Sequence, residues 1–438
     1  MFLCEFVANV LLKDYSRGSC VKVLWVINKP LPAVSKKLGL KIELSQTWLH
    51  ELSQSLREAG IILCTVCVDS VKNMYEISID GANHYVMPIG NKFKSKGFYK
   101  KFWKRIIEKE TPDLIHIHGT EYRHALSLLN LYPNIATLLS IQGIMTRISE
   151  HFYGGLTIKE VLRYRTVKEN VRLGGMLFTK RLYKKQIKIE QEIIKKVHGV
   201  TGRTLWDYSI LKQINPDIHY FRCWYSLRPD FYTADKWNLE KIDRYSIYTS
   251  FSSYPLKGLH VLLKAVALLK EEFPHILVKV PGVKGDKEGK LTVVSGYTKY
   301  LKKLISQYGL ESNVQFLGGQ TTSEVIQNLQ SAHLCVVSSA IEGASSTLRE
   351  AMHIGTPCIA SFRGGMTELL SDGTDGFYYD YSEFPYLAER IREVFKNDQM
   401  AQKFSDGVIE KAKTLHDRQK NTEDMLNAYK EMIALDKR

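Results

Sequence analysis

Two carboxylates stand eight residues apart in the second half of the chain, at Glu342 and Glu350. The apolar run before Glu342 predicts a buried strand, and the residues from Ser346 predict a helix that Gly355 ends. Glu342 then lies on the turn and Glu350 in the early turns of the helix, so both can face one ligand. The free N–H groups and the positive dipole at the helix start lie between them and favour an anion.

A pair of glutamates at this spacing is also common on a solvated helix face, so the surrounding residues decide its meaning. Here the chain resembles glycosyltransferase family 4, whose motif is two glutamates with seven residues between them at a strand–turn–helix junction. The resemblance covers most of residues 245–380 and is looser at Pro112–Gly119 and Thr201–Asp207. Its further matches are Lys257-Gly258, Pro281-Gly282, Val314–Gly318, Gly355-Thr356-Pro357, Gly364-Gly365, Glu368 and Asp375-Gly376.

The resemblance implies a GT-B fold, with two doubly wound parallel-sheet, Rossmann-like α/β domains facing a central cleft. It implies a retaining enzyme that moves a hexose-type sugar from a UDP- or GDP-sugar to a saccharide or lipid-linked saccharide, in polysaccharide or glycolipid assembly. The catalytic residues it implies are Glu342 at the donor sugar, Lys257 at the departing diphosphate and His118 at the acceptor or the sugar 6-position. The substrate-binding residues it implies are Glu350 at the ribose hydroxyls, with Gly343, Ala344, Ser345, Ser346, Thr347, Leu348, Gly282 and Thr47.

Two departures from the family pattern affect this expected site. Ser252 stands where the family usually has an arginine five residues before the lysine. Either Arg349 or Arg203 supplies the missing cation, or phosphate binding is weaker. Gln46-Thr47 replaces the glycine pair expected after the first strand, which leaves the acceptor side open.

The sequence predicts no metal and no cofactor other than the nucleotide sugar, which is a substrate. No Asp-x-Asp occurs in the chain, whereas metal-dependent transferases use such a pair to hold a divalent ion. A lysine and helix dipoles can neutralise the diphosphate instead. His116 and His118 form an HxH on one strand face, but without a third ligand in sequence reach His116 is interpreted as a core residue.

Seven scattered cysteines indicate reduced core thiols of a cytoplasmic protein. Cys64 and Cys67 make a CxxC, which is typical of redox or metal sites. In a predicted strand, however, they point to opposite faces, so both are expected in the core.

The net charge of +15 favours a polyanionic partner. Lys92–Ile107 carries seven Lys or Arg and no acid, and Lys159–Lys196 carries twelve against four acids. With their aromatic and aliphatic neighbours, these segments suit an anionic membrane surface, which predicts a peripheral position on the inner face of the cytoplasmic membrane. The alternative is an ordinary solvated helix face that packs on the first domain. No nucleic-acid-binding module accompanies the segments, so no nucleic acid is expected.

Strand and helix patterns alternate twice along the chain, which predicts two successive doubly wound domains. The predicted parts are an N-terminal acceptor-side domain (1–225), a linker (226–240), a C-terminal donor domain (241–405) and a C-terminal helix (406–438) that packs back toward the N-terminal domain. Ligands of open α/β sheets bind at the carboxyl ends of the strands. We therefore expect the active site in the groove between the two domains.

The predicted elements are these. In the first half, strands are expected at Val21–Asn28, Ile61–Val68, Leu114–His118, Ala136–Ile141 and, as the last one, Lys196–Thr201, with a loop at Pro30 and Pro32 and a helix from Ser45 to Gly60. In the second half, strands are expected at Tyr245–Ser250, Ile276–Val280, Val314–Leu317, Leu334–Ser338 and Pro357–Ala360, and helices at Gly258–Glu272, Tyr297–Tyr308, Ser346–His353 and from Glu383 onward.

Two other classes of function stay open at this level. One is another GT-B enzyme, a nucleotide-sugar epimerase or a phosphorylase, that uses the same residues without a separate acceptor. The other is a basic membrane- or nucleic-acid-binding protein with a vestigial nucleotide site, which the residue at Ser252 and the missing glycine pair would allow.

Overall fold

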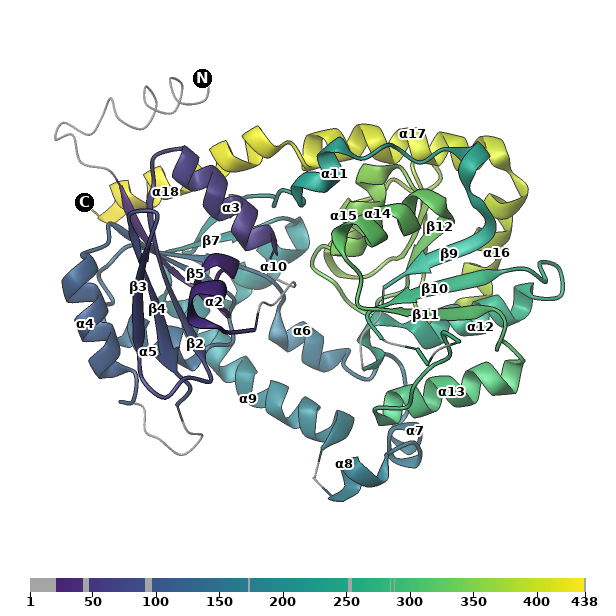
Figure 1. The fold of residues 1–438 in the computed structure, drawn as a ribbon, viewed down its shortest axis with the longest axis horizontal. Helices are drawn as coiled ribbons and strands as arrows, with labels where there is room; N and C mark the ends of the chain where they lie inside the picture. The colour runs from purple at the N-terminus through teal and green to yellow at the C-terminus, as the bar shows by residue number, and fades with distance from the viewer. Residues whose placement is uncertain are drawn as a thin grey trace. The chain divides into compact units, whose positions relative to one another are not determined.

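The computed structural model describes residues 21–41, 47–90, 97–171, 174–250, 254–283, 285–286 and 288–436. These residues form two compact units that do not follow chain order (Figure 1). The first unit takes in the described parts of Met1–Ile144, Gln186–Arg228 and Asp417–Arg438, and the second those of Met145–Lys185 and Pro229–His416. The predicted helix start at Ser45-Gln46, residues 92–96 of the basic segment and Ser252 lie outside the described residues.

The first unit is built on an eight-stranded sheet in the order β3-β4-β2-β1-β5-β6-β7-β8. Its neighbours are parallel, except for the antiparallel hairpin of β3 and β4. The strands are β1 (Lys22–Val26), β2 (Ile62–Asp69), β3 (Tyr75–Ile79), β4 (Ala82–Pro88), β5 (Leu114–His118), β6 (Thr137–Ser140), β7 (Gly199–Gly202) and β8 (His219–Arg222). The helices are α2 (Pro32–Leu38), α3 (Thr47–Glu58), α4 (Lys100–Glu110), α5 (Arg123–Leu131), α10 (Leu205–Ile214) and α18 (Arg418–Asp436). A further helix, α9 (Gly175–Lys196), begins in the second unit and ends in the first.

Both faces of this sheet are buried, as the continuous apolar strands require. Val23 and Trp25 of β1 belong to one core cluster, and Leu24 and Val26 belong to the other. Cys67 and Cys64 are likewise divided between these two clusters, which confirms that the CxxC points to opposite faces. Burial raises the pKa of the Cys64 thiol to about 11, as suits an inert core residue.

Helix α18, from the end of the chain, completes one of these cores. Its Met425, Tyr429 and Met432 are buried in the same cluster as Trp25. The Trp25 Nε1–H donates to the Tyr429 hydroxyl at 2.9 Å, and that hydroxyl lies 2.7 Å from His116 Nδ1. His116 Nε2 in turn lies 2.7 Å from Ser140 Oγ. His116 is therefore a buried core residue with both ring nitrogens partnered, as predicted.

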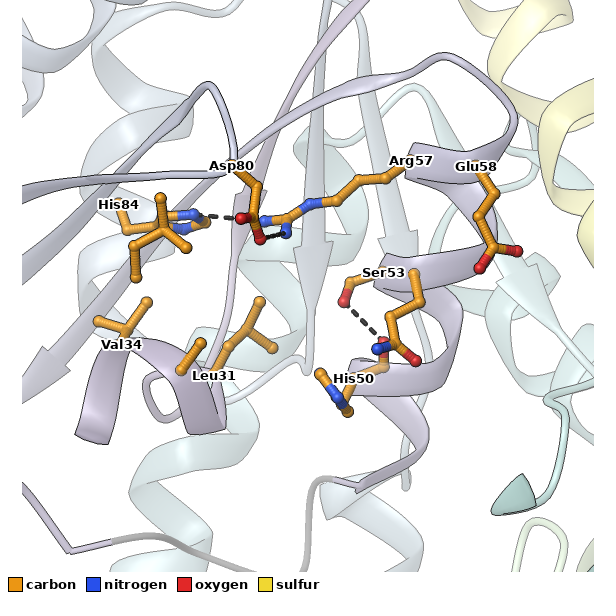
Figure 2. Close-up of a pocket in the computed structure, with 11 residues that line it drawn as sticks. Leu31, Val34, His50, Ser53, Arg57, Glu58, Asp80 and His84 are labelled. Atoms are coloured by element: carbon orange, nitrogen blue, oxygen red, sulfur yellow. Dashed lines mark hydrogen bonds and ion pairs between the residues drawn. The ribbon is translucent and has the colours of Figure 1, made fainter. Parts of the chain in front are cut away.

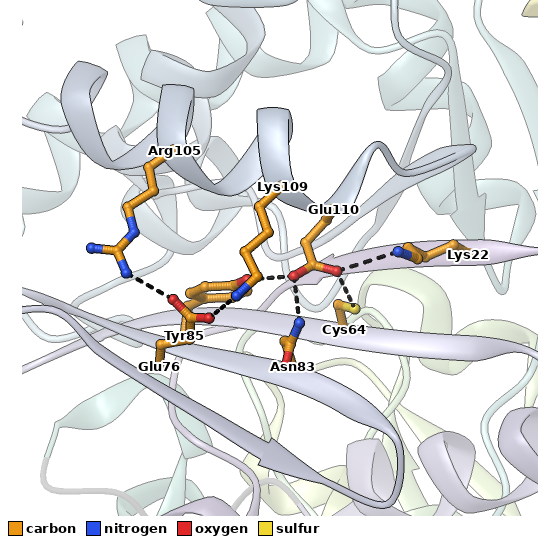
Figure 3. Close-up of polar contacts among 8 residues, drawn as sticks. All are labelled: Lys22, Cys64, Glu76, Asn83, Tyr85, Arg105, Lys109 and Glu110. Atoms are coloured by element: carbon orange, nitrogen blue, oxygen red, sulfur yellow. Dashed lines mark hydrogen bonds and ion pairs between the residues drawn. The ribbon is translucent and has the colours of Figure 1, made fainter.

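A second buried polar cluster surrounds Glu110, the last residue of α4 (Figure 3). Its carboxylate accepts hydrogen bonds from the Tyr85 hydroxyl, from Asn83 Nδ2 at 2.8 Å and from the Cys64 thiol at 3.2 Å. Burial by itself would raise the pKa of Glu110, but these hydrogen bonds outweigh it and lower the pKa. The cluster fixes the end of α4 against the sheet.

The second unit holds a six-stranded parallel sheet in the order β11-β10-β9-β12-β13-β14. Numbered along the chain, this is the 3-2-1-4-5-6 order of Rossmann folds, and the order reverses between β9 and β12. The strands are β9 (Asp243–Thr249), β10 (Leu277–Pro281), β11 (Val314–Gly318), β12 (Ala332–Val337), β13 (Cys358–Ser361) and β14 (Phe377–Tyr379).

Both chain segments of the second unit contribute helices. They are α6 (Met145–Glu150), α7 (Ile158–Arg163), α8 (Val167–Val171), α11 (Pro229–Thr233), α12 (Leu259–Leu269), α13 (Gly296–Tyr308), α14 (Thr322–Ser331), α15 (Ser346–Ile354), α16 (Phe384–Lys396) and α17 (Asp398–Leu415). Short 3₁₀ turns are η2 (Leu239–Lys241), η3 (Pro255–Lys257) and η4 (Gly364–Glu368). In the described part of the chain, no helix is both long and apolar enough to cross a bilayer.

Most predicted elements are present, and the differences have local causes. The loop predicted at Pro30 and Pro32 is wrong, because Pro32 begins helix α2 as its first residue. Lys196–Thr201 is not the last strand of the first half, because β8 follows and pairs with β7. The unpredicted β3–β4 hairpin turns at Asp80-Gly81, both at positive φ, which is the Asp-Gly turn that two-residue hairpins favour.

The Tyr429 network predicts a measurable contribution to stability. Tyr429→Phe leaves the buried Trp25 N–H and His116 Nδ1 without their partner, which should lower the free energy of unfolding by about 1–3 kcal/mol. Urea denaturation followed by tryptophan fluorescence measures this change. Tyr75→Phe is the matched control, because Tyr75 is exposed and should change stability by less than about 0.5 kcal/mol. Equal midpoints for the two variants would contradict the role of Tyr429.

Candidate functional site

Two predicted catalytic side chains meet at the point where strand order reverses in the second unit. Lys257 ends η3, which follows β9, and Glu342 follows the adjacent strand β12. The Lys257 ammonium is ion-paired with Glu342 Oε1, and Ser339 Oγ donates to the same oxygen at 2.9 Å. Both side chains are half-buried, at 28% and 15% exposure. Ligands of open α/β sheets bind at such a reversal, so the pair occupies the expected position.

The backbone that carries Lys257 lies directly against the end of β12. Ala340 N–H donates to Leu256 O at 2.7 Å, and Ser338 Oγ donates to Lys257 O at 3.2 Å. Gly258 has φ +67°, and a Cβ there would overlap the Ser338 carbonyl oxygen. Only glycine fits this left-handed position at such a close approach. The lysine is thereby fixed relative to Glu342.

Glu342 is held from its other side by the glycine pair of η4. Gly365 N–H donates to Glu342 O at 2.9 Å. Gly364 has φ +64°, and a Cβ at this residue would overlap the same carbonyl oxygen. The Gly364-Gly365 match noted in the sequence is therefore explained by a close backbone approach behind Glu342.

Helix α15 begins next to this pair. Ser345 is its N-cap, and the Ser345 Oγ accepts a hydrogen bond from Leu348 N–H at 3.5 Å. In the first turn Ser346 is exposed and Thr347 is half-exposed. The neighbouring residues Gly343, Ala344 and Leu348 are buried. Glu350 is half-buried one turn further on, and Gly355 ends the helix at φ +94°. The predicted strand–turn–helix junction is confirmed, with N–H groups at an accessible helix start that can receive an anion.

A segment of the first half of the chain, not predicted from the sequence, supports the turn that carries Lys257. The Gly154 carbonyl accepts hydrogen bonds from the Tyr381 hydroxyl at 2.8 Å and from His260 Nε2 at 2.9 Å. The Phe152 ring stacks on Tyr254, which precedes η3, with 5.2 Å between centroids. The adjacent glycines Gly154 and Gly155, both at positive φ, were the available signal.

The remaining predicted residues lie after another strand of the second unit or in the first unit. Gly282 follows β10, is exposed and has φ +90°. Thr47 begins α3 of the first unit, and its side chain lies outside the described part. His118 ends β5 of the first unit, fully buried, with its ring 4.4 Å from Trp25 and 4.0 Å from His116 between centroids. Burial and His116 lower the pKa of His118 well below its usual value, so the ring is neutral.

Neither arginine considered as a replacement cation is presented to solvent. Arg349 is buried in α15, with Nη2 3.3 Å from His416 Nδ1. Arg203 is buried in the first unit, where its Nη2 donates to Ile141 O at 3.0 Å. Lys257 is therefore the cation that the structure places beside Glu342.

A cavity of about 220 Å³ lies elsewhere, in the first unit, against α2, α3 and the β3–β4 hairpin (Figure 2). Its polar wall is Arg57, which pairs with Asp80 at 3.2 Å and lies 3.3 Å from His84 Nε2. None of the predicted site residues lines it. Among the described residues, no group of three His, Cys, Asp or Glu side chains could hold a metal ion.

Known proteins resemble this chain in sequence and in fold. Residues 234–411, nearly the whole second segment of the second unit, match the family model "Glycosyl transferases group 1". The chain is 29% identical over 143 residues to D-inositol 3-phosphate glycosyltransferase of Corynebacterium urealyticum, which is 33% of this chain and 33% of that protein. The aligned part thus spans about a third of the length of the curated relatives it matches.

Solved structures extend the likeness to the first unit. Sucrose-phosphate synthase of Thermosynechococcus elongatus has a TM-score of 0.70 at 15% identity, covering 95% of this chain and 100% of that one. HepE of Anabaena, solved with UDP and glucose, has a TM-score of 0.65 at 16% identity, covering 93% and 99%. At these identities the likeness shows the fold. The family match therefore places residues 234–411 among the glycosyl transferases of group 1, and the shared fold of both units shows that the chain has the GT-B fold.

Proposed function

We propose that this protein transfers a hexose-type sugar, with retention of the anomeric configuration, from a UDP- or GDP-sugar to a saccharide or lipid-linked saccharide in polysaccharide or glycolipid assembly. The observation that carries the proposal is the Lys257–Glu342 pair at the strand reversal, next to the free start of α15. HepE, which shares the fold, was solved with UDP-glucose. WaaG, with a TM-score of 0.60, is described as a glycosyltransferase involved in lipopolysaccharide biosynthesis.

The proposed chemistry assigns each side of the ion pair a task. The bond between the anomeric carbon and the diphosphate oxygen breaks, and the electron pair leaves with the diphosphate. Lys257 and the N–H groups from Ala344 to Thr347 neutralise that leaving charge, and removal of one such donor typically costs about 10²–10³ in rate. Glu342 exchanges the ammonium for the sugar hydroxyls and stabilises the positive charge that develops at the anomeric carbon. The acceptor oxygen then bonds to that carbon, and its proton passes to the departing diphosphate oxygen.

The other predicted residues complete this proposal. Glu350 accepts hydrogen bonds from the ribose hydroxyls, and Gly282 lines the donor side after β10. Residues 241–405 bind the donor, and residues 1–225, with Thr47 and His118, form the acceptor side. The diphosphate is neutralised without a metal, because a fixed lysine and helix dipoles provide the positive charge.

We further propose a cytoplasmic protein that works peripherally at the inner face of the membrane, without a nucleic-acid partner. Of the two basic segments predicted to meet an anionic bilayer, Lys92–Ile107 and Lys159–Lys196, the second supports this contact. The five described cysteines are buried free thiols, as is usual for a reducing compartment.

The ribose role of Glu350 can be tested by binding. Glu350→Ala removes a carboxylate that hydrogen-bonds two hydroxyls, so the Kd for UDP or GDP should rise about tenfold or more. Isothermal titration calorimetry measures the change. Glu311→Ala, which removes an exposed carboxylate from the same unit, is the control and should leave the Kd unchanged. Full affinity in Glu350→Ala would rule out this assignment, and donor turnover without any acceptor would favour an epimerase.

The close approach at Gly258 generates a second test. Gly258→Ala places a methyl group on the Ser338 carbonyl oxygen and should displace Lys257 as well as destabilise the unit. Gly373→Ala is the matched control: it also has positive φ, but no atom lies within 4 Å of the added Cβ. In both variants the free energy of unfolding should fall by about 1–2 kcal/mol, because alanine is strained in the left-handed backbone conformation. Only Gly258→Ala should lose further stability and UDP affinity, and equal thermal midpoints would refute the proposed constraint.

A further inference from the structure

Five large apolar side chains are exposed within one short stretch of the second unit. They belong to α7, α8 and the start of α9, which follow one another along the chain (Figure 1). Their exposed fractions are Ile158 52%, Leu162 50%, Val167 79%, Val171 78% and Phe178 42%. Single exposed apolar residues are normal, but a concentration of them marks an interaction surface. We call residues 157–188 the arm.

The helices of the arm are held to the rest of the second unit by Glu169. Its carboxylate accepts hydrogen bonds from Thr166 N–H at 2.8 Å and from Gly296 N–H, at the start of α13, at 3.0 Å. The Glu169 carbonyl accepts a hydrogen bond from Arg165 Nη2 at 3.1 Å. The exposed apolar residues therefore lie on helices that are hydrogen-bonded to α13 of the same unit.

The same arm is strongly basic. Residues 157–188 contain ten Lys or Arg and two Glu. Both glutamates are engaged internally, Glu169 as above and Glu160 in the capping box of Thr157. On α9 one stripe at helical spacing is exposed and carries only cations, namely Arg181, Lys184, Lys185 and Lys188.

The other basic segment of the chain is organised differently. On α4, Trp103 and Ile106 are buried against the first sheet. Arg105 and Lys109 both form ion pairs with Glu76 (Figure 3). The described part of that segment is therefore an ordinary packed helix with a partly neutralised outer face, and the arm carries the unpacked apolar residues.

We propose that the arm docks on an anionic lipid bilayer. Leu162, Val167 and Val171 enter the interfacial region, and the cations of α9 meet the lipid phosphates, which is the division of labour of interfacial helices. A nucleic acid would use the cations but not the exposed aliphatic groups. This inference rests on the proposed peripheral position at the membrane and names the residues that make the contact, whereas it does not require the proposed transfer reaction.

Co-sedimentation of the full chain with vesicles tests the proposal. The protein should bind phosphatidylcholine vesicles that contain phosphatidylglycerol, and should not bind phosphatidylcholine alone. Lys184→Gln with Lys185→Gln should weaken binding about 30-fold, since each cation near an anionic surface contributes about 1 kcal/mol. Val167→Ser with Val171→Ser should weaken it about tenfold or more.

Matched controls separate the arm from nonspecific effects. Lys302→Gln with Lys303→Gln removes two adjacent exposed cations of α13, and Leu268→Ser removes a side chain as exposed as Leu162, at 51%. Both control variants should bind vesicles like the parent protein. The proposal would be overturned if the protein did not bind anionic vesicles, or if the control variants lost as much binding as the arm variants. It would also be overturned if the protein bound single-stranded RNA and the valine substitutions changed neither RNA binding nor vesicle binding. The arm variants should bind UDP with unchanged affinity, so a loss of vesicle binding can be distinguished from a defect of the donor site.

Discussion

The site in the second unit depends on a close backbone contact between Gly258 and Ser338, which only a residue without a side chain allows. Because Gly258 lies on the Ser338 carbonyl, the turn after β9 can touch the end of β12. That contact brings a lysine and a glutamate from adjacent strands into one ion pair. The glycines of η4 make a similar close backbone contact with the carbonyl oxygen of Glu342. Three loops at the carboxyl ends of the sheet therefore close on one another, and the start of α15 is left as the accessible anion-binding element.

A reversal of strand order also occurs in the first unit, where it holds a different set of side chains. Its order also reverses between two strands, β1 and β5, and Trp25 of β1 lies against the His116 and His118 rings of β5. Here the side chains are buried and neutral, and the C-terminal helix closes the network through Tyr429. A reversal of strand order thus accompanies a half-buried charged pair in the second unit and a buried polar core in the first.

Local patterns were sufficient for the Glu342–Glu350 junction, for β5 and for helices such as α15, because each is encoded within a few residues by apolar periodicity and a capping glycine or serine. What could not be predicted depends on residues far apart in the chain. The Lys257–Glu342 pair joins positions 85 apart, and Gly154 supports a turn about a hundred residues later. Strand β8 has no buried residue in its pattern, so no apolar run marked it. The placement of residues 145–185 with the second unit likewise has no local signal.

We propose that Lys257 holds the donor diphosphate and that Glu342 pairs with this lysine until the donor binds. Calorimetric Kd values for UDP in Lys257→Ala, Glu342→Gln and the double variant test it directly. We expect Lys257→Ala to weaken UDP binding about tenfold or more, since a hydrogen bond to a charged group contributes about 1.5–3 kcal/mol. Glu342→Gln removes a competitor of the phosphates and should leave the affinity equal or higher, and the double variant should match Lys257→Ala. Unchanged affinity in Lys257→Ala, or an equal loss in Glu342→Gln, would contradict the account.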